Sequence, residues 1–231
     1  MPFGLFDPTM LLLVPAIGFA LWAQWKVTHT YRKYSEVRAA KGLTGSQMAK
    51  AIMNRNGVTD VAVEEVSGVL SDHYDPRARK VCLSAHNFRE PSLAAMAIGA
   101  HEVGHALQHA QGYAPLALRS AIAPVAGFGS MMAFPLFFVG FIFQSGALAW
   151  LMDLGILVFA GAVVFHLVTL PVEFDASKRA LSELSSCGAL APQEVVGAKM
   201  VLDAAALTYV AAAAMAAVQL IRLVLLRRGR D

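Results

Sequence analysis

Two histidines and a glutamate in this sequence have the spacing of a hydrolytic metal site. Residues 101–105 read HEVGH, so His101 and His105 are four positions apart and Glu102 directly follows the first histidine. On an α-helix, residues four apart lie on one face, and both imidazoles can therefore bind a single Zn²⁺ ion. Zinc lowers the pKa of a bound water molecule to about 7, and Glu102 can accept its proton as a general base. The pattern predicts metal-assisted hydrolysis of peptide bonds.

A catalytic zinc ion needs a third protein ligand, for which the sequence offers three candidates. His109 continues the four-residue series, but it lies a further helical turn, about 5.4 Å, along the axis, which favours a surface or supporting role. Glu173 and Asp175 follow directly after a long apolar block. Acidic residues in a first helical turn are ordinary partners of the helix dipole. A carboxylate at the very end of an apolar block is costly without a partner, so Glu173 is the stronger candidate.

The metal motif lies in a segment with strong helical signals. Ser92 can act as the N-cap of a helix whose pattern continues to a stop at Gly112. A second helix is expected over residues 171–186, and residues 191–194 begin another that leads into an alanine-rich block. These helices would carry the HEVGH motif and the acidic candidates.

The residues before the motif change from helical to strand-like patterns. Residues 29–56 predict two helices that separate near Gly42, with Thr44 or Ser46 capping the second. A turn at Asp75-Pro76-Arg77 then predicts a β-hairpin, in which residues 68–74 pair with residues 79–84.

The composition indicates a membrane protein. Of the 231 residues, 57% are hydrophobic and only 15% are charged, against about 25% in a typical soluble domain. Residues 8–25 and 204–221 carry no charge, and residues 120–172 carry only Asp153. Such blocks approach or exceed the roughly 30 Å of a bilayer core, and the middle block can form two spans with a turn near residues 144–146. We expect a mainly α membrane protein with three to four transmembrane helices and a small α+β zincin-like catalytic domain.

The apolar blocks also suggest how the chain is organised. We expect residues 1–25 to be an N-terminal membrane anchor, 26–119 a catalytic domain with the zinc helix, 120–171 a transmembrane helical hairpin, 172–203 the third-ligand helix and the helix after it, and 204–231 a C-terminal apolar helix associated with the membrane.

Basic residues flank the apolar blocks, as the positive-inside rule expects, so the net charge of +3 does not indicate a nucleic-acid partner. This distribution places residues 26–119 and 172–203 in the cytoplasm. Arg227, Arg228 and Arg230 oppose a fourth crossing, because they would carry positive charge to the outer side. The sequence leaves open whether the last apolar helix crosses.

Four segments, in order, carry a family resemblance over nearly the whole chain. They read DHYDPR at residues 72–77, AHEVGHA at 100–106, PVEFDAS at 171–177 and LDAAALTYV at 202–210. They resemble the YugP-type neutral zinc metallopeptidases of bacterial membranes, whose layout is similar to that of the HtpX and CAAX-prenyl proteases. The resemblance implies a bacterial membrane protein. Together with the distribution of basic residues, it leads us to expect a multi-pass protein of the inner membrane with its active site on the cytoplasmic side.

In those related proteases the third ligand is the glutamate of a Glu-Phe-x-Ala-Asp segment, and the resemblance therefore assigns it to Glu173. This sequence departs from the wider pattern, because Asp175 occupies the third place and Ser177 stands where the final aspartate is expected. The carboxylate that orients a ligand histidine is thus either replaced by Asp175 or missing.

Three further residues are candidates for binding substrate. His73 and Tyr74 lie on the predicted hairpin, whose edge could bind an extended peptide, and Tyr209 could donate a hydrogen bond to the oxyanion. Each is equally well explained as a packed or interfacial side chain.

The favoured interpretation is a zinc endopeptidase that acts on membrane proteins or membrane-proximal peptides. A first alternative is a non-proteolytic scaffold or adaptor with a structural zinc site. A second is cleavage inside the bilayer, which charged and polar residues beside the motif disfavour. The lipid bilayer is an expected partner, and the sequence does not fix the number of subunits in any oligomer.

Overall fold

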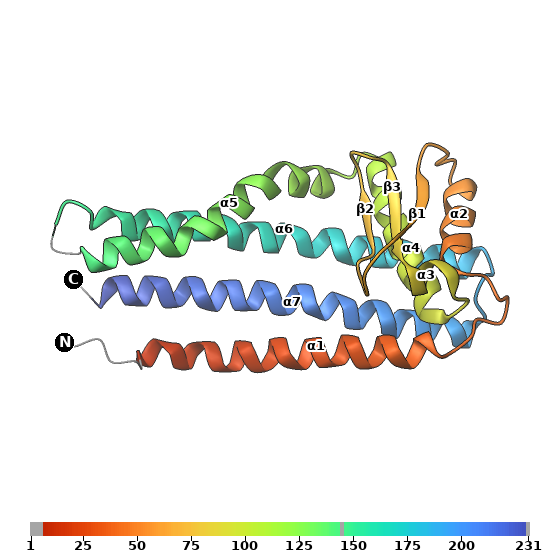
Figure 1. Ribbon diagram of the computed structural model, residues 1–231, viewed down its shortest axis with the longest axis horizontal. Coiled ribbons are helices and arrows are strands. Elements are labelled where there is room, and N and C mark those ends of the chain that lie inside the picture. Colours follow the sequence, from red (N-terminus) through yellow and green to blue (C-terminus); the bar gives the residue numbers. More distant parts are fainter. Residues whose placement is uncertain (1–6, 144–145, 230–231) are drawn as a thin grey trace. The chain divides into compact units, whose positions relative to one another are not determined.

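The computed structural model describes residues 7–143 and 146–229. Helices dominate this part of the chain, and a small three-stranded sheet accompanies them (Figure 1). In chain order the elements are η1 (Pro8–Leu12), α1 (Leu13–Ser35), α2 (Gly45–Arg55), β1 (Ala62–Val66), β2 (His73–Asp75), β3 (Lys80–Ser84), α3 (Ala85–Arg89), α4 (Leu93–Ala110), α5 (Ala114–Ile142), α6 (Trp150–Ser186) and α7 (Pro192–Arg228). The predicted fold class, a mainly α membrane protein with a small α+β part, is confirmed.

The chain divides into two compact units. The membrane unit comprises Met1–Ala23, Leu118–Leu170 and Thr208–Asp231, and the sheet unit comprises Gln24–Ala117 and Pro171–Leu207. Both the HEVGH motif and Glu173 therefore belong to the sheet unit. The domain boundaries expected from the apolar blocks remain predictions.

The sheet has the strand order β1-β3-β2, with β1 parallel and β2 antiparallel to β3. The turn at Asp75-Pro76-Arg77 and the pairing of β2 with β3 agree with the predicted hairpin. The first strand of that hairpin was predicted too long, because β2 begins only at His73. Gly68 and Leu70 have φ angles of 108° and 54°, which are incompatible with an extended strand.

Two predicted helix starts are confirmed by their caps. The Thr44 side chain accepts a hydrogen bond from the Gln47 backbone N–H, and the Gln47 side chain accepts one from the Thr44 backbone N–H, which forms a capping box at the start of α2. The Ser92 side chain accepts from the Ala95 backbone at the start of α4. Both helices thus begin where a side chain satisfies an otherwise unpaired backbone N–H group.

Two other predicted boundaries are wrong. We expected a new helix to begin near Pro171, but α6 is continuous from Trp150 to Ser186 with Pro171 inside it. Likewise, α1 extends from the first apolar block to Ser35. In both places the composition changes from apolar to amphipathic while the backbone stays helical, and composition was mistaken for a break.

Within the described residues, four helical segments are long and apolar enough to cross a membrane: Pro8–Ser35, Ala114–Ile142, Trp150–Ser186 and Pro192–Arg228. In the membrane unit, Phe137, Met152 and Leu223 are among the fully buried side chains of a shared apolar core. Gly146 lies in a turn, as expected, whereas positions 144 and 145 of that predicted turn lie outside the described residues.

Candidate metal centre

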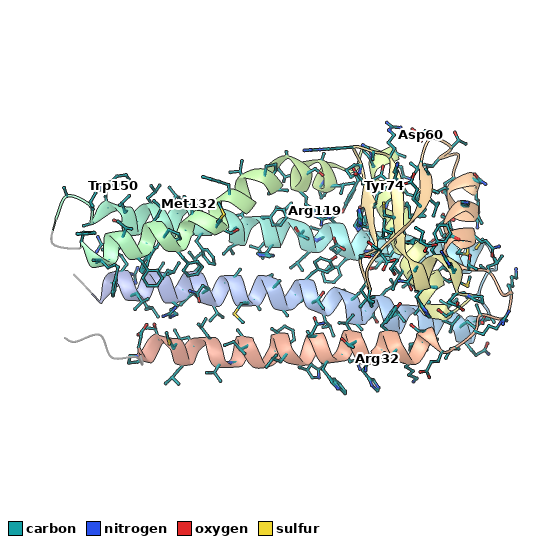
Figure 2. All side chains as sticks on the ribbon, in the orientation of Figure 1. Arg32, Asp60, Tyr74, Arg119, Met132 and Trp150 are labelled. Carbon is teal, nitrogen blue, oxygen red and sulfur yellow. The ribbon has the colours of Figure 1, made fainter. Side chains whose placement is uncertain are left out.

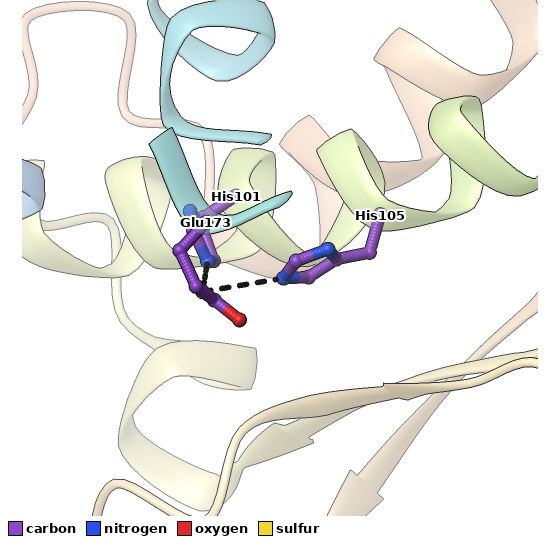
Figure 3. Close-up of side chains that lie close together, drawn as sticks. All are labelled: His101, His105 and Glu173. Atoms are coloured by element: carbon purple, nitrogen blue, oxygen red, sulfur yellow. Dashed lines mark hydrogen bonds and ion pairs between the residues drawn. The ribbon is translucent and has the colours of Figure 1, made fainter. Parts of the chain in front are cut away.

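Helices α4 and α6 bring together three side chains that could hold a metal ion (Figure 3). His101 and His105 extend from one face of α4, with their ring centroids 4.8 Å apart. Glu173 of α6 reaches between them, and its Oε2 atom lies 3.2 Å from His101 Nε2 and 3.6 Å from His105 Nε2. We call these three residues the metal triad.

The donor atoms of the metal triad fit a catalytic zinc ion. They all lie within 4.8 Å of one another, which is close enough for one ion to bind them after small side-chain movements. Glu173 is only 2% exposed and His105 only 6% exposed. Two imidazole nitrogens and one carboxylate oxygen form the His₂Glu set of catalytic zinc sites, which keeps a fourth position open.

Glu102 lies on α4 beside the first histidine and is buried. Burial raises the pKa of its carboxyl group above the ordinary value, although the imidazoles of His101 and His105 oppose the rise. Burial alone would lower the pKa of His105, but the Glu173 and Glu102 carboxylates outweigh it and raise that pKa. A carboxyl group with a raised pKa is better matched to general acid–base work near neutral pH.

Both histidines of the metal triad are held at their other ring nitrogen. Ser177 Oγ lies 3.1 Å from His101 Nδ1, and Gln108 Oε1 lies 3.0 Å from His105 Nδ1. Such contacts orient a metal-binding imidazole and select its tautomer. Ser177, which stands where the pattern of the related proteases has an aspartate, contacts His101.

Asp175 is linked to His105 through one intermediate side chain, that of Gln108. Its Oδ2 atom accepts a hydrogen bond from Gln108 Nε2 at 2.8 Å and another from Arg179 Nε at 2.5 Å. Asp175 therefore reaches His105 through Gln108 and is outside the metal triad. Arg179 is itself fixed by Gln111 Oε1, at 2.5 Å from its Nη1, and lies over the Tyr113 ring.

A glycine within the metal motif allows α4 and α6 to approach closely. A Cβ atom added at Gly104 would lie 2.6 Å from the carbonyl oxygen of Ala176, closer than real Cβ contacts permit. The absence of a side chain at Gly104 therefore lets the backbone of α6 pass directly over α4. This contact sets the separation between the two histidines and Glu173.

The remaining predicted residues lie outside the metal triad. His109 is exposed, and its Nδ1 atom lies 2.7 Å from the hydroxyl of Tyr74 on strand β2, which agrees with a surface or supporting role. Tyr74 is labelled in Figure 2. His73 is exposed and its ring contacts the Ser71 carbonyl. Tyr209 belongs to the membrane unit, so its proposed contact with the oxyanion remains a prediction.

Sequence reasoning missed Gln108. It is fully buried and follows His105 by three positions on α4, so the two side chains share a helix face. A polar residue on the apolar side of a helix, one turn after a metal ligand, was the available signal. Its contacts with α6 could not be seen, because they join residues more than sixty positions apart.

Comparisons with known proteins identify the family of this chain. The family model described as "Putative neutral zinc metallopeptidase" matches residues 9–228. Over 223 residues the chain is 47% identical to the "Putative membrane protease YugP" of Bacillus subtilis (strain 168), an alignment that covers 96% of this chain and 98% of the relative. No solved structure matches the chain.

Proposed function

This chain belongs to the family described as "Putative neutral zinc metallopeptidase", and we propose that it is a membrane-bound zinc endopeptidase. The family match confirms the resemblance that the sequence motifs carried. The proposed reaction is hydrolysis of peptide bonds in membrane or membrane-proximal proteins. The observation that carries the proposal is the buried metal triad, in which two imidazoles and one carboxylate face a common point beside Glu102.

The proposed roles follow from the positions of the side chains. His101, His105 and Glu173 would hold the zinc ion, which supplies Lewis-acid activation of water and of the substrate carbonyl. Glu102 accepts a proton from the attacking water and passes it to the leaving amine. Its burial favours this role, because a carboxyl group in a poorly hydrated setting exchanges protons closer to neutral pH.

Strand β2 is the element best suited to bind a substrate. It is at one edge of the sheet, and its Tyr74 contacts His109 on the metal-binding helix. An extended peptide could pair with this edge and thereby lie along the helix that carries Glu102. Substrates with an unfolded segment near the membrane surface would meet this requirement.

We place the site on the cytoplasmic side of the bacterial inner membrane, because basic residues flank the apolar blocks on the sides that enclose the metal motif. Under this proposal α7 crosses the membrane. In the membrane unit, Arg222 Nη2 lies 3.3 Å from Asp7 Oδ2 and Arg227 Nε lies 3.0 Å from Asp153 Oδ1. Such pairing reduces the cost of carrying arginines to the outer side. Arg230 lies outside the described residues.

The decisive experiment compares the wild-type protein with Glu102→Gln. Zinc content is measured by mass spectrometry of the purified protein, and new peptide ends are measured in native membranes by proteomics. We expect one zinc ion per chain in both proteins, and a loss of about 10²- to 10⁴-fold in cleavage for the variant, because only proton transfer is removed. Glu90→Gln, at an exposed position on the same unit, should cleave like the wild type.

Two outcomes would contradict the proposal. A wild-type protein without stoichiometric zinc would remove the metal mechanism. A protein that binds zinc but shows no cleavage dependent on Glu102 would instead support the scaffold interpretation, in which zinc is structural.

A further inference from the structure

Gln108 makes a set of contacts that leaves its amide only one satisfactory orientation. Its Nε2 atom lies 2.8 Å from the Val172 carbonyl oxygen and 2.8 Å from Asp175 Oδ2. A carbonyl oxygen can only accept a hydrogen bond, and Asp175 Oδ2 acts as an acceptor as well, because it also accepts the Arg179 Nε–H at 2.5 Å. If the amide were reversed, its oxygen would face two acceptors. Both N–H groups of the amide are therefore used on α6.

This orientation decides the tautomer of His105. With Nε2 directed at α6, the Oε1 atom of Gln108 must face His105 Nδ1, which lies 3.0 Å away. Since Oε1 can only accept, Nδ1 must carry the hydrogen. The lone pair of the neutral ring is then on Nε2, the atom that faces Glu173 Oε2. A metal ligand needs that arrangement.

We propose that Gln108 is the positioning residue of the metal centre, which fixes His105 in the tautomer that binds zinc through Nε2. This inference rests on the proposed zinc function and names a residue outside the metal triad. Asp175 and Arg179 support Gln108, because Asp175 Oδ2 accepts a hydrogen bond from both Gln108 and Arg179.

The arrangement also accounts for the departure from the wider family pattern. A single aspartate is expected to orient one histidine, and this chain has Ser177 in its place, on His101. A hydroxyl group can donate or accept, so Ser177 does not select a tautomer. Gln108 does, because its two donors are already used. In this chain the tautomer is therefore selected at His105, the second histidine of the motif.

The test uses the full-length protein in detergent and the variant Gln108→Met, which keeps chain length and helix propensity but removes the amide. Zinc affinity is measured by competition with a chromophoric chelator, and the visible absorption spectrum is recorded after Co²⁺ substitution. We expect affinity to fall by about 10- to 100-fold, the usual loss when a ligand-orienting contact is removed. The Co²⁺ spectrum should change, because His105 is no longer held in one orientation.

Gln193→Met is the matched control, since Gln193 is exposed at the start of α7. Its affinity and Co²⁺ spectrum should equal those of the wild type. Gln108→Leu provides a second measurement if the methionine variant does not fold. It also removes the amide without placing a new charge beside Asp175, so its zinc affinity should fall by the same margin of about 10- to 100-fold, the loss expected for a ligand-orienting contact.

The outcomes separate this inference from the proposed function. Unchanged zinc affinity and an unchanged Co²⁺ spectrum in Gln108→Met would overturn the positioning role and leave the zinc function intact. Unchanged zinc affinity in Gln108→Leu would likewise overturn it, because the amide would then contribute nothing to zinc binding. A wild-type protein that binds no zinc would overturn both.

Discussion

The two units of this protein contain acidic side chains that are paired in different ways. In the membrane unit, Asp7 faces Arg222 and Asp153 faces Arg227, so each carboxylate meets a permanently charged guanidinium. In the sheet unit, Glu173 faces the imidazoles of His101 and His105, whose charge depends on whether they are protonated. Glu173 is also the most deeply buried of the three carboxylates, at 2% exposed.

This difference indicates which group is built for a ligand. An arginine–carboxylate pair is neutral as a whole and needs no additional ion to balance its charge. A buried carboxylate between two neutral imidazoles carries a negative charge that a bound cation can balance, and both of its neighbours are themselves good zinc donors. Buried charge alone therefore does not mark the metal site; the chemical type of the partners does.

The largest effect should come from Glu173→Gln, which keeps the size of the side chain but removes its charge. Zinc affinity should fall by more than about 100-fold, beyond the loss from an outer contact, because a ligand itself is removed. Asp7→Asn, the matched change in the membrane unit, should leave zinc content unchanged. Chelator competition on both purified variants checks this. Tight zinc binding by Glu173→Gln would contradict the assignment of Glu173, in contrast to Asp7, as a zinc ligand.

A smaller effect is expected from Gly104→Ala. The added methyl group would meet the Ala176 carbonyl, and such overpacking costs about 1–3 kcal/mol of unfolding free energy, along with weaker zinc binding. Gly161→Ala, on the membrane-unit part of α6, should stay within about 1 kcal/mol of the wild type, because nothing lies within 4 Å of its added Cβ. Thermal unfolding of both variants measures the difference. Equal stabilities would mean that α6 is not closely packed on α4.

Ser177→Ala should weaken zinc binding by about 10-fold, since His101 loses the contact at its Nδ1 atom. Ser177→Asp should strengthen binding relative to the wild type, because a carboxylate fixes the tautomer and raises the basicity of the ring. Both values come from chelator competition at one pH. If the alanine variant binds as tightly as the wild type, the hydroxyl group does not orient His101.

The smallest effect should follow Asp153→Asn. The side chain of Asp153 is 60% exposed, so loss of its contact with Arg227 should change the unfolding free energy by less than about 1 kcal/mol. Zinc affinity should be unchanged. A large loss of zinc from this variant would contradict the separate roles assigned to the two groups.

Local features of this fold could be predicted from the sequence. The caps at Thr44 and Ser92 depend on residues three positions apart, and the shared face of His101 and His105 depends only on helical periodicity. Glu173 came from family resemblance and from the cost of a carboxylate at the end of an apolar block. The structure places it beside both histidines.

Other features depend on contacts that sequence patterns do not encode. The parallel pairing of β1 with β3 joins segments separated by a strand and two turns. The continuity of α6 through Pro171 depends on its surroundings, since proline is tolerated within long membrane helices more often than in soluble ones. The contacts of Gln108 and Ser177 arise only when α6 lies on α4, and no spacing rule predicts that arrangement.

One short stretch of α6 carries Glu173, Asp175 and Ser177, within roughly one and a half helical turns. The same stretch therefore brings three groups to α4: the Glu173 carboxylate, the Asp175 carboxylate that holds Gln108, and the Ser177 hydroxyl that contacts His101. A slip of one residue along α6, a shift of about 1.5 Å with a rotation of about 100°, would withdraw all of them at once. Under the proposed function, zinc binding would therefore depend on the register of α6 against α4, and the zinc content of a variant would report whether that register is kept.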